Sequence, residues 1–168
     1  MKHWQGLCGL LLLLLLLLAS GCGSSGEPTQ LTPLEELLTR LKDQDAGNRY
    51  SALREITQQG PTTAKQAVPQ IIAALADKDA GVRVGAALAV PLCGHDGAAA
   101  VPRLIELLKD PDPKVRAAAA AAFPPLGPAA QTAVAALQSL SRDKEASVRE
   151  AASHALKQMA NNQKFSKS

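Results

Sequence analysis

The chain has 168 residues, and its 18 Lys and Arg against 15 Asp and Glu give a formal net charge of only +3. Because the charges are balanced and interspersed, the composition does not favour a nucleic-acid-binding protein. Aromatic residues make up 2% of the chain, so a binding face must work with few of the aromatic anchors that dominate most binding hot spots.

Residues 1–21 have the features of a signal peptide. Lys2 supplies a positive charge, and an apolar run follows at residues 7–19. As a helix this run would reach about 20 Å, which is short of the ~30 Å hydrocarbon core of a membrane. The segment therefore predicts export and removal of the leader rather than a membrane span.

The end of this leader carries a second signal. Residues 19–22, with the sequence ASGC, resemble a bacterial lipoprotein box, which implies cleavage before Cys22 and lipidation of that cysteine. The alternative is an ordinary secretory signal cut near the same place. Residues 22–32 would then be the lipidated cysteine and a flexible tether. We expect an exported lipoprotein, anchored to the membrane at the periplasmic or outer face of the cell envelope.

Beyond this tether the chain repeats with a period of 33 residues. The copies that start at Val68, Val101 and Val134 each end on an arginine, and a looser copy starts at Leu34. A repeat of this length predicts units that cannot bury their apolar faces alone and must stack. The arginines that end the three regular copies are Arg83, Arg116 and Arg149.

Each copy predicts two helices joined by a polar turn. In the second copy, apolar residues recur at spacings of three and four over residues 68–75 and again over residues 82–93. Asp79 in the turn is the expected N-cap of the second helix, and Gly94 is expected to end it. Gly60 and Gly127 correspond to Gly94 in neighbouring copies.

Other positions complete the expected packing. Pro124 and Pro125 should shorten or kink the end of their helix, because proline lacks an amide donor and clashes with the preceding turn. Cys93 has no partner for a disulfide and is expected to be a small buried residue. The end copies carry polar residues where the inner copies are apolar, as solenoid caps require. These are Asn48, Gln59, Gln138 and Ser141.

The pattern AVPxLIxxLxDxDxxVRxxAAxAL…LG resembles the short bacterial HEAT repeats, also called phycobilisome-lyase-type HEAT-like repeats. The resemblance covers about residues 33–160. It implies an all-α fold, a short right-handed α-solenoid of about four helical hairpins. The first helices would lie on the convex side and the second helices on the concave side. Residues 161–168 are expected to form a polar C-terminal tail.

An acidic pair recurs in every turn. A calcium site would need more converging oxygen ligands, including a later bidentate glutamate, and the spacing does not supply one. We favour helix capping together with a structural ladder, in which each arginine pairs with an acid of an adjacent repeat. As exposed ion pairs these would contribute only ~0–1 kcal/mol each. The ladder residues are Asp77, Asp79, Arg83, Asp110, Asp112, Arg116 and Arg149.

No motif for catalysis or metal binding was found. His95 and His154 lie on different units, and the chain has neither a Cys-x-x-Cys pair nor a phosphate-binding glycine loop. Among HEAT-repeat enzymes, deoxyhypusine hydroxylases hold di-iron with His-Glu dipeptides, and none occurs here. Bilin lyases carry similar repeats but act inside the cell. We therefore expect no enzyme activity, no cofactor, no metal and no catalytic residues.

The solvent side of the second helices is the candidate binding surface. Positions off the core stripe form rows across the repeats, apolar and small in the middle and polar towards each end. The alternatives are an alanine-lined wall without a role, or a helical phase that buries Leu88. The hypothesis is a partner-binding groove with apolar residues at its centre and a rim that is mostly polar. The centre would be Val84, Leu88, Pro91, Ala121 and Pro124, and the rim Tyr50, Arg54, Glu150 and Lys157.

These features predict a membrane-anchored, non-enzymatic scaffold or adaptor that binds a protein or peptide at the cell envelope. One alternative is an enzyme or cofactor-handling protein of the HEAT-like family. Another is a structural spacer or folding partner for a neighbouring envelope protein. The sequence itself does not identify the partner.

Overall fold

The computed structural model describes residues 31–165 of the chain. The leader expected at residues 1–21 and the lipidated cysteine, Cys22, lie outside the described residues. Residues 31–165 form one compact unit. Its described part is built from helices and contains no strand.

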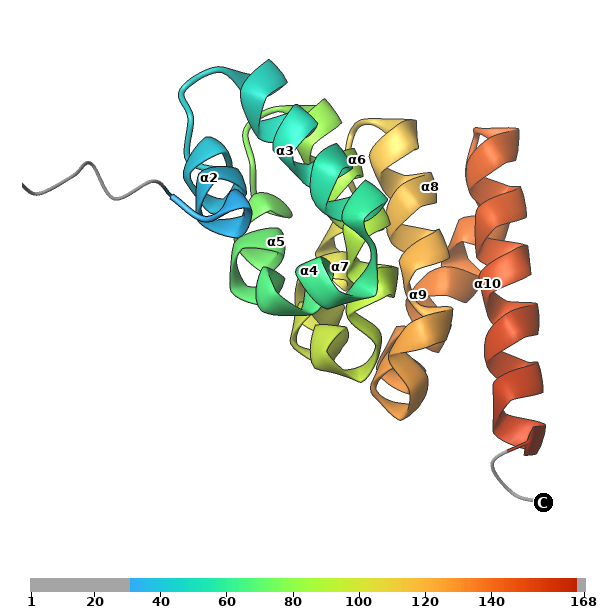
Figure 1. Cartoon of the computed structure of the whole chain (residues 1–168). Helices are drawn as coiled ribbons and strands as arrows, with labels where there is room; N and C mark the ends of the chain where they lie inside the picture. Colours follow the sequence, from blue (N-terminus) through green and yellow to red (C-terminus); the bar gives the residue numbers. More distant parts are fainter. Residues whose placement is uncertain (1–30, 166–168) are drawn as a thin grey trace, which may run out of the picture. The chain divides into compact units, whose positions relative to one another are not determined.

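Helical hairpins follow one another along the chain, as the repeats predict (Figure 1). Each hairpin pairs a short first helix with a second helix, and the two are joined by a turn that contains the acidic pair. The hairpins are α2 (Pro33–Arg40) with α3 (Ala46–Gln59), α5 (Val68–Ala74) with α6 (Ala80–Ala89), α7 (Val101–Leu107) with α8 (Pro113–Ala122), and α9 (Val134–Ser139) with α10 (Ala146–Phe165).

Aspartates start the second helices. The side chain of Asp79 accepts a hydrogen bond from the Val82 amide at 3.0 Å, which confirms the expected N-cap. Asp45 and Asp112 have the same role at α3 and α8. Each carboxylate satisfies an amide that has no partner within its helix, and the helix dipole favours its negative charge there.

Prolines and glycines end the second helices. The α-helices α6 and α8 end at Ala89 and Ala122, and a 3₁₀ turn containing a proline follows each of them. These turns belong to the segments η1 (Val90–Ala100) and η2 (Pro124–Ala133), so the expected effect of Pro124 is confirmed. The chain then reverses at a glycine with a positive φ, 56° at Gly94 and 63° at Gly127.

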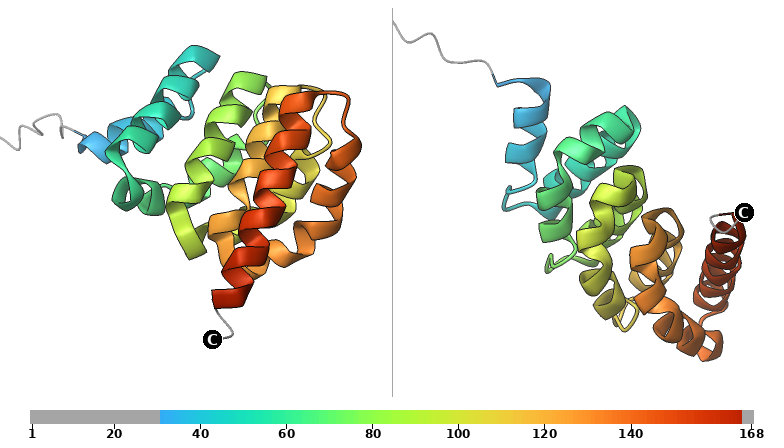
Figure 2. Two further views of the ribbon diagram at one scale, coloured as in Figure 1. Left: turned by 90° about the vertical axis from the view of Figure 1, so that its right-hand side faces the viewer. Right: turned by 90° about the horizontal axis from the view of Figure 1, so that it is seen from below.

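The second helices pack side by side in chain order, α3 on α6, α6 on α8 and α8 on α10. Within the repeat domain they line the inner side of a curve, and the first helices lie outside them (Figure 2). A short helix, α4 (Pro61–Gln66), packs on η1, and η1 packs on η2, so the connections between hairpins also stack.

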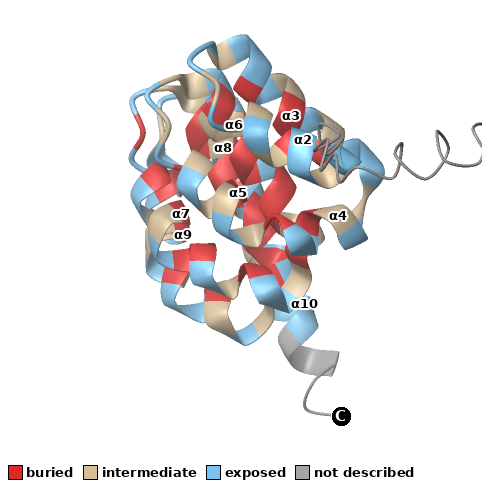
Figure 3. Cartoon of the chain, turned by 60° about the vertical axis from the view of Figure 1, so that its left-hand side comes forward, coloured by how far each residue is buried: buried red, intermediate tan, exposed pale blue. Residues whose placement is uncertain are grey.

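Buried residues form one continuous core between the two layers (Figure 3). Val82, Ala86, Ala89, Val90 and Cys93 are all buried, so the expected apolar face is confirmed, although Val90 and Cys93 lie in η1 because α6 ends at Ala89. Alanines at many core positions let the helices approach closely, and Phe123 is the largest side chain that is fully buried.

Helix α10 continues to Phe165. The prediction of a tail over residues 161–168 was therefore wrong for the first part of that segment.

Within the described residues, the stretch Ala80–Leu107 is long and apolar enough by composition to cross a membrane. Half of its apolar window is buried in the domain and Gly94 interrupts it, so it is weak evidence for a membrane span.

Candidate functional site

An arginine ladder runs along the stack. Arg49, Arg83 and Arg116 each bind an aspartate of the next repeat. Arg83 donates from Nε to Oδ2 of Asp110 at 2.8 Å and from Nη2 to Oδ1 at 3.0 Å. Its Nη1 donates to the main-chain oxygens of Asp77 and Lys78, in the turn of its own repeat, at 2.9 and 3.1 Å. The guanidinium therefore ties two successive turns together with a bidentate pair.

The same geometry occurs at the neighbouring positions. Arg116 holds Asp143 with two bonds of 2.8 Å. Arg49 holds Asp77 with two bonds of 2.7 Å, although the sequence reasoning did not include Arg49 in the ladder. Arg49 was missed because it belongs to the irregular first copy of the repeat. Its position just after the first polar turn was the signal that could have identified it.

Two expectations about this ladder were wrong. The pairs were expected to be exposed, but the side chains of Arg49, Arg83 and Arg116 are only 7–14% exposed, because the next hairpin covers them. Arg149 was expected to pair with an acid of an adjacent repeat. It forms no ion pair within the described residues, because no repeat follows it there.

The pairing shifts the pKa values of its members. Hydrogen bonds from Arg116 hold the pKa of the Asp143 carboxyl below its usual value. Burial acts to raise the pKa of Asp77, but the hydrogen bonds from Arg49 and from the Asp79 amide outweigh it and the net shift is downward. The carboxylates of Asp77 and Asp143 are therefore charged near neutral pH.

The candidate binding surface lies on the exposed side of α3, α6, α8 and α10, and we call it the concave face. Leu88 on α6 is 50% exposed and Tyr50 on α3 is 41% exposed. The helical phase expected for α6 is thus confirmed, and Leu88 is not a core residue. Ala121 on α8 is also exposed, and Val84 and Pro91 are half-buried.

Gly85 lets the ring of Tyr50 approach α6 closely. A Cβ atom on Gly85 would lie 3.1 Å from Cδ2 of Tyr50 and 3.3 Å from Cδ1 of Leu53. The tyrosine ring therefore lies against the backbone of α6, one helical turn from Leu88. A glycine inside a helix costs about 1 kcal/mol relative to alanine, and here it makes room for the ring.

The rim of the concave face carries charges. Arg54 on α3 and Glu150 and Lys157 on α10 are exposed, and none of them forms an ion pair with another described residue. Pro124 was expected at the centre of the face but is buried. The end of α10, longer than expected, packs on η2, and the side chain of Asn162 donates to the Pro124 oxygen at 3.2 Å.

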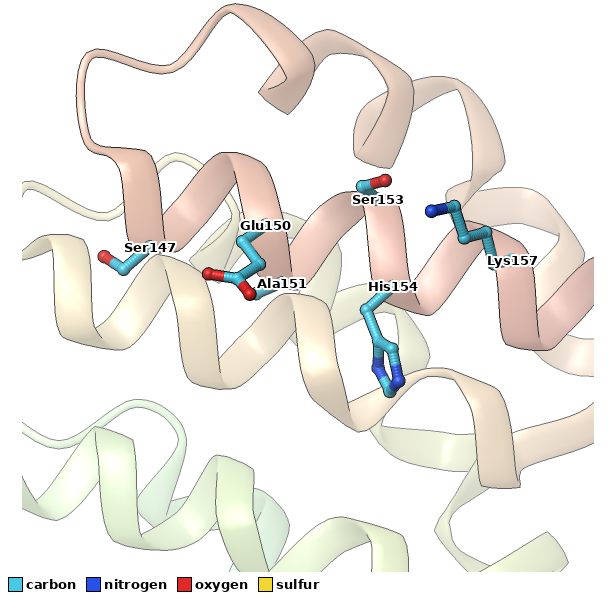
Figure 4. Close-up of a pocket in the computed structure, with 6 residues that line it drawn as sticks. All are labelled: Ser147, Glu150, Ala151, Ser153, His154 and Lys157. Carbon is cyan, nitrogen blue, oxygen red and sulfur yellow. The ribbon is translucent and has the colours of Figure 1, made fainter.

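The α10 end of the concave face is slightly hollowed. An open hollow of about 500 Å³ is lined by α10 side chains, including Glu150, His154 and Lys157. Figure 4 shows these side chains spread along the helix rather than converging on one point. Such a hollow can contact a partner side chain, but it does not enclose a small substrate.

The groups capable of other chemistry lie apart. No cluster of three or more His, Cys, Asp or Glu side chains in the described part of the chain could hold a metal ion. Cys93 is buried, and this burial raises the pKa of its thiol to about 11. At neutral pH the group is therefore an unreactive thiol rather than a thiolate.

Comparison with solved structures supports this architecture. An engineered protein superposes with a TM-score of 0.64 at 24% identity, over 77% of this chain and 63% of its own length. Human deoxyhypusine hydroxylase gives 0.59 at 24% identity, over 80% of this chain and 46% of the enzyme. The complex of CpcE and CpcF of phycocyanin lyase from Nostoc sp. PCC7120 gives 0.54 at 23% identity, over 84% of this chain and 69% of that chain.

At these identities the similarity concerns the fold alone. This chain spans less than two thirds of the engineered protein and under half of the hydroxylase. A search of curated proteins found no match. The profile that describes HEAT repeats matches residues 34–122 and 101–167, which together are most of the chain. The chain therefore belongs to the HEAT-repeat family.

Proposed function

We propose that this protein is a non-enzymatic adaptor that binds a segment of another protein across its concave face. One observation carries the proposal: the large apolar side chains of Leu88 and Tyr50 are both exposed, on the adjacent helices α6 and α3. Apolar patches with polar rims mark interaction sites on soluble domains. Here Arg54 and Glu150 provide charges at opposite ends of the face.

The shape of the face favours a protein segment over a small molecule. The side chains between Leu88 and the rim are small, so a partner can approach the helices closely along the whole row. Leu88 and Tyr50 would be the central contacts, where solvent exclusion makes apolar contacts most valuable. Unpaired charges at both ends would fix the orientation of the partner.

The location of the adaptor at the cell envelope is proposed from the sequence. Lipidation of Cys22 and the tether at residues 22–32 would hold the repeat domain at the cell envelope. Several acyl chains anchor a protein firmly, whereas one chain binds only marginally. Metabolic labelling with a palmitate analogue tests this point, and a Cys22→Ala variant should lose both the label and the membrane fraction.

The substitution Leu88→Glu tests the binding face. It should abolish recovery of a stoichiometric partner after in-cell crosslinking, because it places a charge at the centre of the apolar patch. It should change the free energy of unfolding by about 0.5 kcal/mol or less, since Leu88 is exposed and both residues favour helices. Ala73→Glu is the matched control, because Ala73 is exposed on α5, outside the concave face.

The outcome distinguishes three cases. Loss of the partner with Leu88→Glu but not with Ala73→Glu supports the concave face. Equal recovery with both variants would contradict this choice of surface. A large drop in melting temperature with Leu88→Glu would mean that Leu88 packs in the core.

A cofactor-handling function is the alternative, because two similar folds belong to deoxyhypusine hydroxylase and phycocyanin lyase. The sequence has no His-Glu dipeptide, and the described residues offer no metal cluster. The absorption spectrum and the metal content of the purified protein test this alternative. A bound chromophore or a stoichiometric metal would replace the adaptor proposal.

A further inference from the structure

Arg149 occupies the last position of the arginine ladder. It lies in the first turn of α10, where Arg49, Arg83 and Arg116 lie in the first turns of the preceding second helices. Arg149 is exposed, whereas the guanidinium groups of the other three are covered by a following repeat.

The guanidinium of Arg149 is already held in the ladder geometry. Its Nη1 donates to the main-chain oxygens of Asp143 and Lys144 at 2.8 and 3.0 Å. Arg83 makes the same two bonds to its own turn. The orientation is thus fixed from within the repeat, before anything binds to the outer edge, and pre-organisation of this kind lowers the entropic cost of binding.

The Nε and Nη2 atoms of the ladder arginines bind the same kind of group in each preceding repeat. In all three preceding cases Nε and Nη2 bind the two oxygens of one aspartate, at 2.7–3.0 Å. Nε and Nη2 of Arg149 have no such acceptor among the described residues. Within the part of the chain that the structure describes, the ladder therefore ends on an open position shaped for a carboxylate.

The opposite end of the ladder is closed. Asp43 is the counterpart of Asp77, but its Oδ2 accepts a hydrogen bond from the Asn48 side chain at 3.0 Å, and Oδ1 accepts from the Asp45 amide. Asn48 thus takes the place that an arginine of a preceding repeat would fill. The nearby pair of Arg40 and Glu55 makes this end more polar still. A second copy of the chain is consequently a poor occupant for the open end.

We propose that the Arg149 end of the stack docks another protein, which supplies a carboxylate from the turn of a helical hairpin and continues the ladder. By register, Ser153 and Leu156 lie on the same outward face of α10, at the positions of Ala87 and Val90 in α6. This site is separate from the concave face, and it does not depend on the proposed function.

The chain itself can supply a probe with a matching carboxylate. The substitutions Asn48→Val and Glu55→Ala restore the residues that stand at these positions in the second repeat, Val82 and Ala89, and release Asp43. Adding Arg149→Gln prevents this probe from associating with itself. Mixed with the unmodified protein, the triple variant should form a 1:1 complex in sedimentation velocity.

Three substitutions at the contact and one control away from it identify the contact. Arg149→Gln in the acceptor should weaken the complex at least tenfold, and Asp43→Asn in the probe should do the same. Arg149→Lys should restore the interaction only in part, since lysine keeps the charge but not the bidentate fork. Leu88→Glu in the acceptor should leave the affinity unchanged. Thermal melting of every variant verifies that it is folded.

Several outcomes would overturn the proposal. Folded components that form no complex, or a complex insensitive to Arg149→Gln, would show that the open position does not bind a hairpin carboxylate. Self-association of the unmodified protein that depends on Arg149 would make a second copy the occupant. Arg149-dependent sedimentation with phosphatidylglycerol vesicles would indicate a lipid phosphate instead of a protein.

Discussion

Arg83 illustrates why charged residues can lie inside this thin helical stack. Its side chain is mostly covered, yet two main-chain oxygens and the Asp110 carboxylate accept its hydrogen bonds. A buried charge is tolerated when it is paired and fully hydrogen-bonded, and removal of one partner leaves an uncompensated group. The contribution of the ladder is therefore best measured by removing one partner at a time.

Arg83→Gln should lower the free energy of unfolding by about 2–3 kcal/mol, because it leaves Asp110 buried without its partner. Arg103→Gln is the matched control: it removes an exposed pair with Glu106 and should cost about 0.5 kcal/mol or less. Urea denaturation measures both values, and a double-mutant cycle with Asp110→Asn isolates the pair. Equal costs for the two arginine variants would show that burial of the ladder has no energetic effect.

The ladder also shows what residue spacing can predict. The 33-residue period placed Arg83 and Arg116 beside acids of the next repeat. It did not reveal the burial of these pairs, because burial depends on how the following hairpin packs against the turn. Nor did it predict that Arg149 has no aspartate or glutamate partner among the described residues. A periodic pattern assigns every arginine the same pairing.

At the level of the helices, the ends are specified more strongly than the middles. Asp79 and Asp112 start α6 and α8, and a proline and a glycine stop each of them. The middle parts of α6 and α8 are rich in alanine, which favours a helix but does not determine its length. Such an arrangement fixes the angle at which each hairpin joins the next.

Gly94→Ala and Gly127→Ala test this role of the helix ends. Both glycines combine φ near +60° with ψ near −135°, a region open to glycine but strained by about 1–3 kcal/mol for other residues, so both variants should lose about that much stability. Gly127→Ala should lose slightly more, because the new Cβ would lie 2.9 Å from Cε1 of His95. Thermal unfolding measures the difference, and adding His95→Ala should remove it. Unchanged stability of Gly94→Ala would mean that the reversal tolerates other backbone conformations.

The sequence predicted the helix starts and the chain reversals at Gly94 and Gly127, because caps and breakers act locally, but α6 ends earlier than expected, at Ala89. It missed the length of α10 and, with it, the burial of Pro124. Both depend on contact between segments 38 residues apart, the distance between Pro124 and Asn162. The exposed position of Leu88 was predicted correctly, because the helical phase follows directly from the apolar stripe.

On the scale of the whole molecule, each repeat is stabilised by its neighbours rather than by distant parts of the chain. The main contacts between helices of the inner layer follow chain order, and the ladder connects the same neighbours. Stability in such a stack is close to a sum of repeat and interface terms. Repeat periodicity therefore sufficed to predict the architecture, whereas the binding partner leaves no periodic trace.

Acid should loosen the whole stack through the ladder. The pKa values of Asp77 and Asp143 are lowered in the folded state, so their stabilising contribution is complete above the unfolded value of about 4. It is lost as the pH falls from there through the lower folded values. The free energy of unfolding should thus be flat in this respect from pH 7 to 5 and decline below about pH 4.

The variant Arg116→Gln provides the comparison for this acid dependence. Without Arg116 the pKa of Asp143 returns towards its ordinary value, so the decline below pH 4 should be shallower than in the unmodified protein. Chemical denaturation at a series of pH values measures both slopes. Parallel curves would show that Asp143 does not contribute to acid unfolding.

The period of the ladder also determines how the protein can change in size. Deletion of residues 84–116 would remove one full repeat and leave Arg83 in the position of Arg116, facing Asp143. Duplication of the same segment would add one pair of the same kind. One extra residue in the connection between repeats is tolerated, because Arg49 lies 34 residues before Arg83 and still binds Asp77. The stack can therefore grow or shrink in whole repeats with its ladder intact.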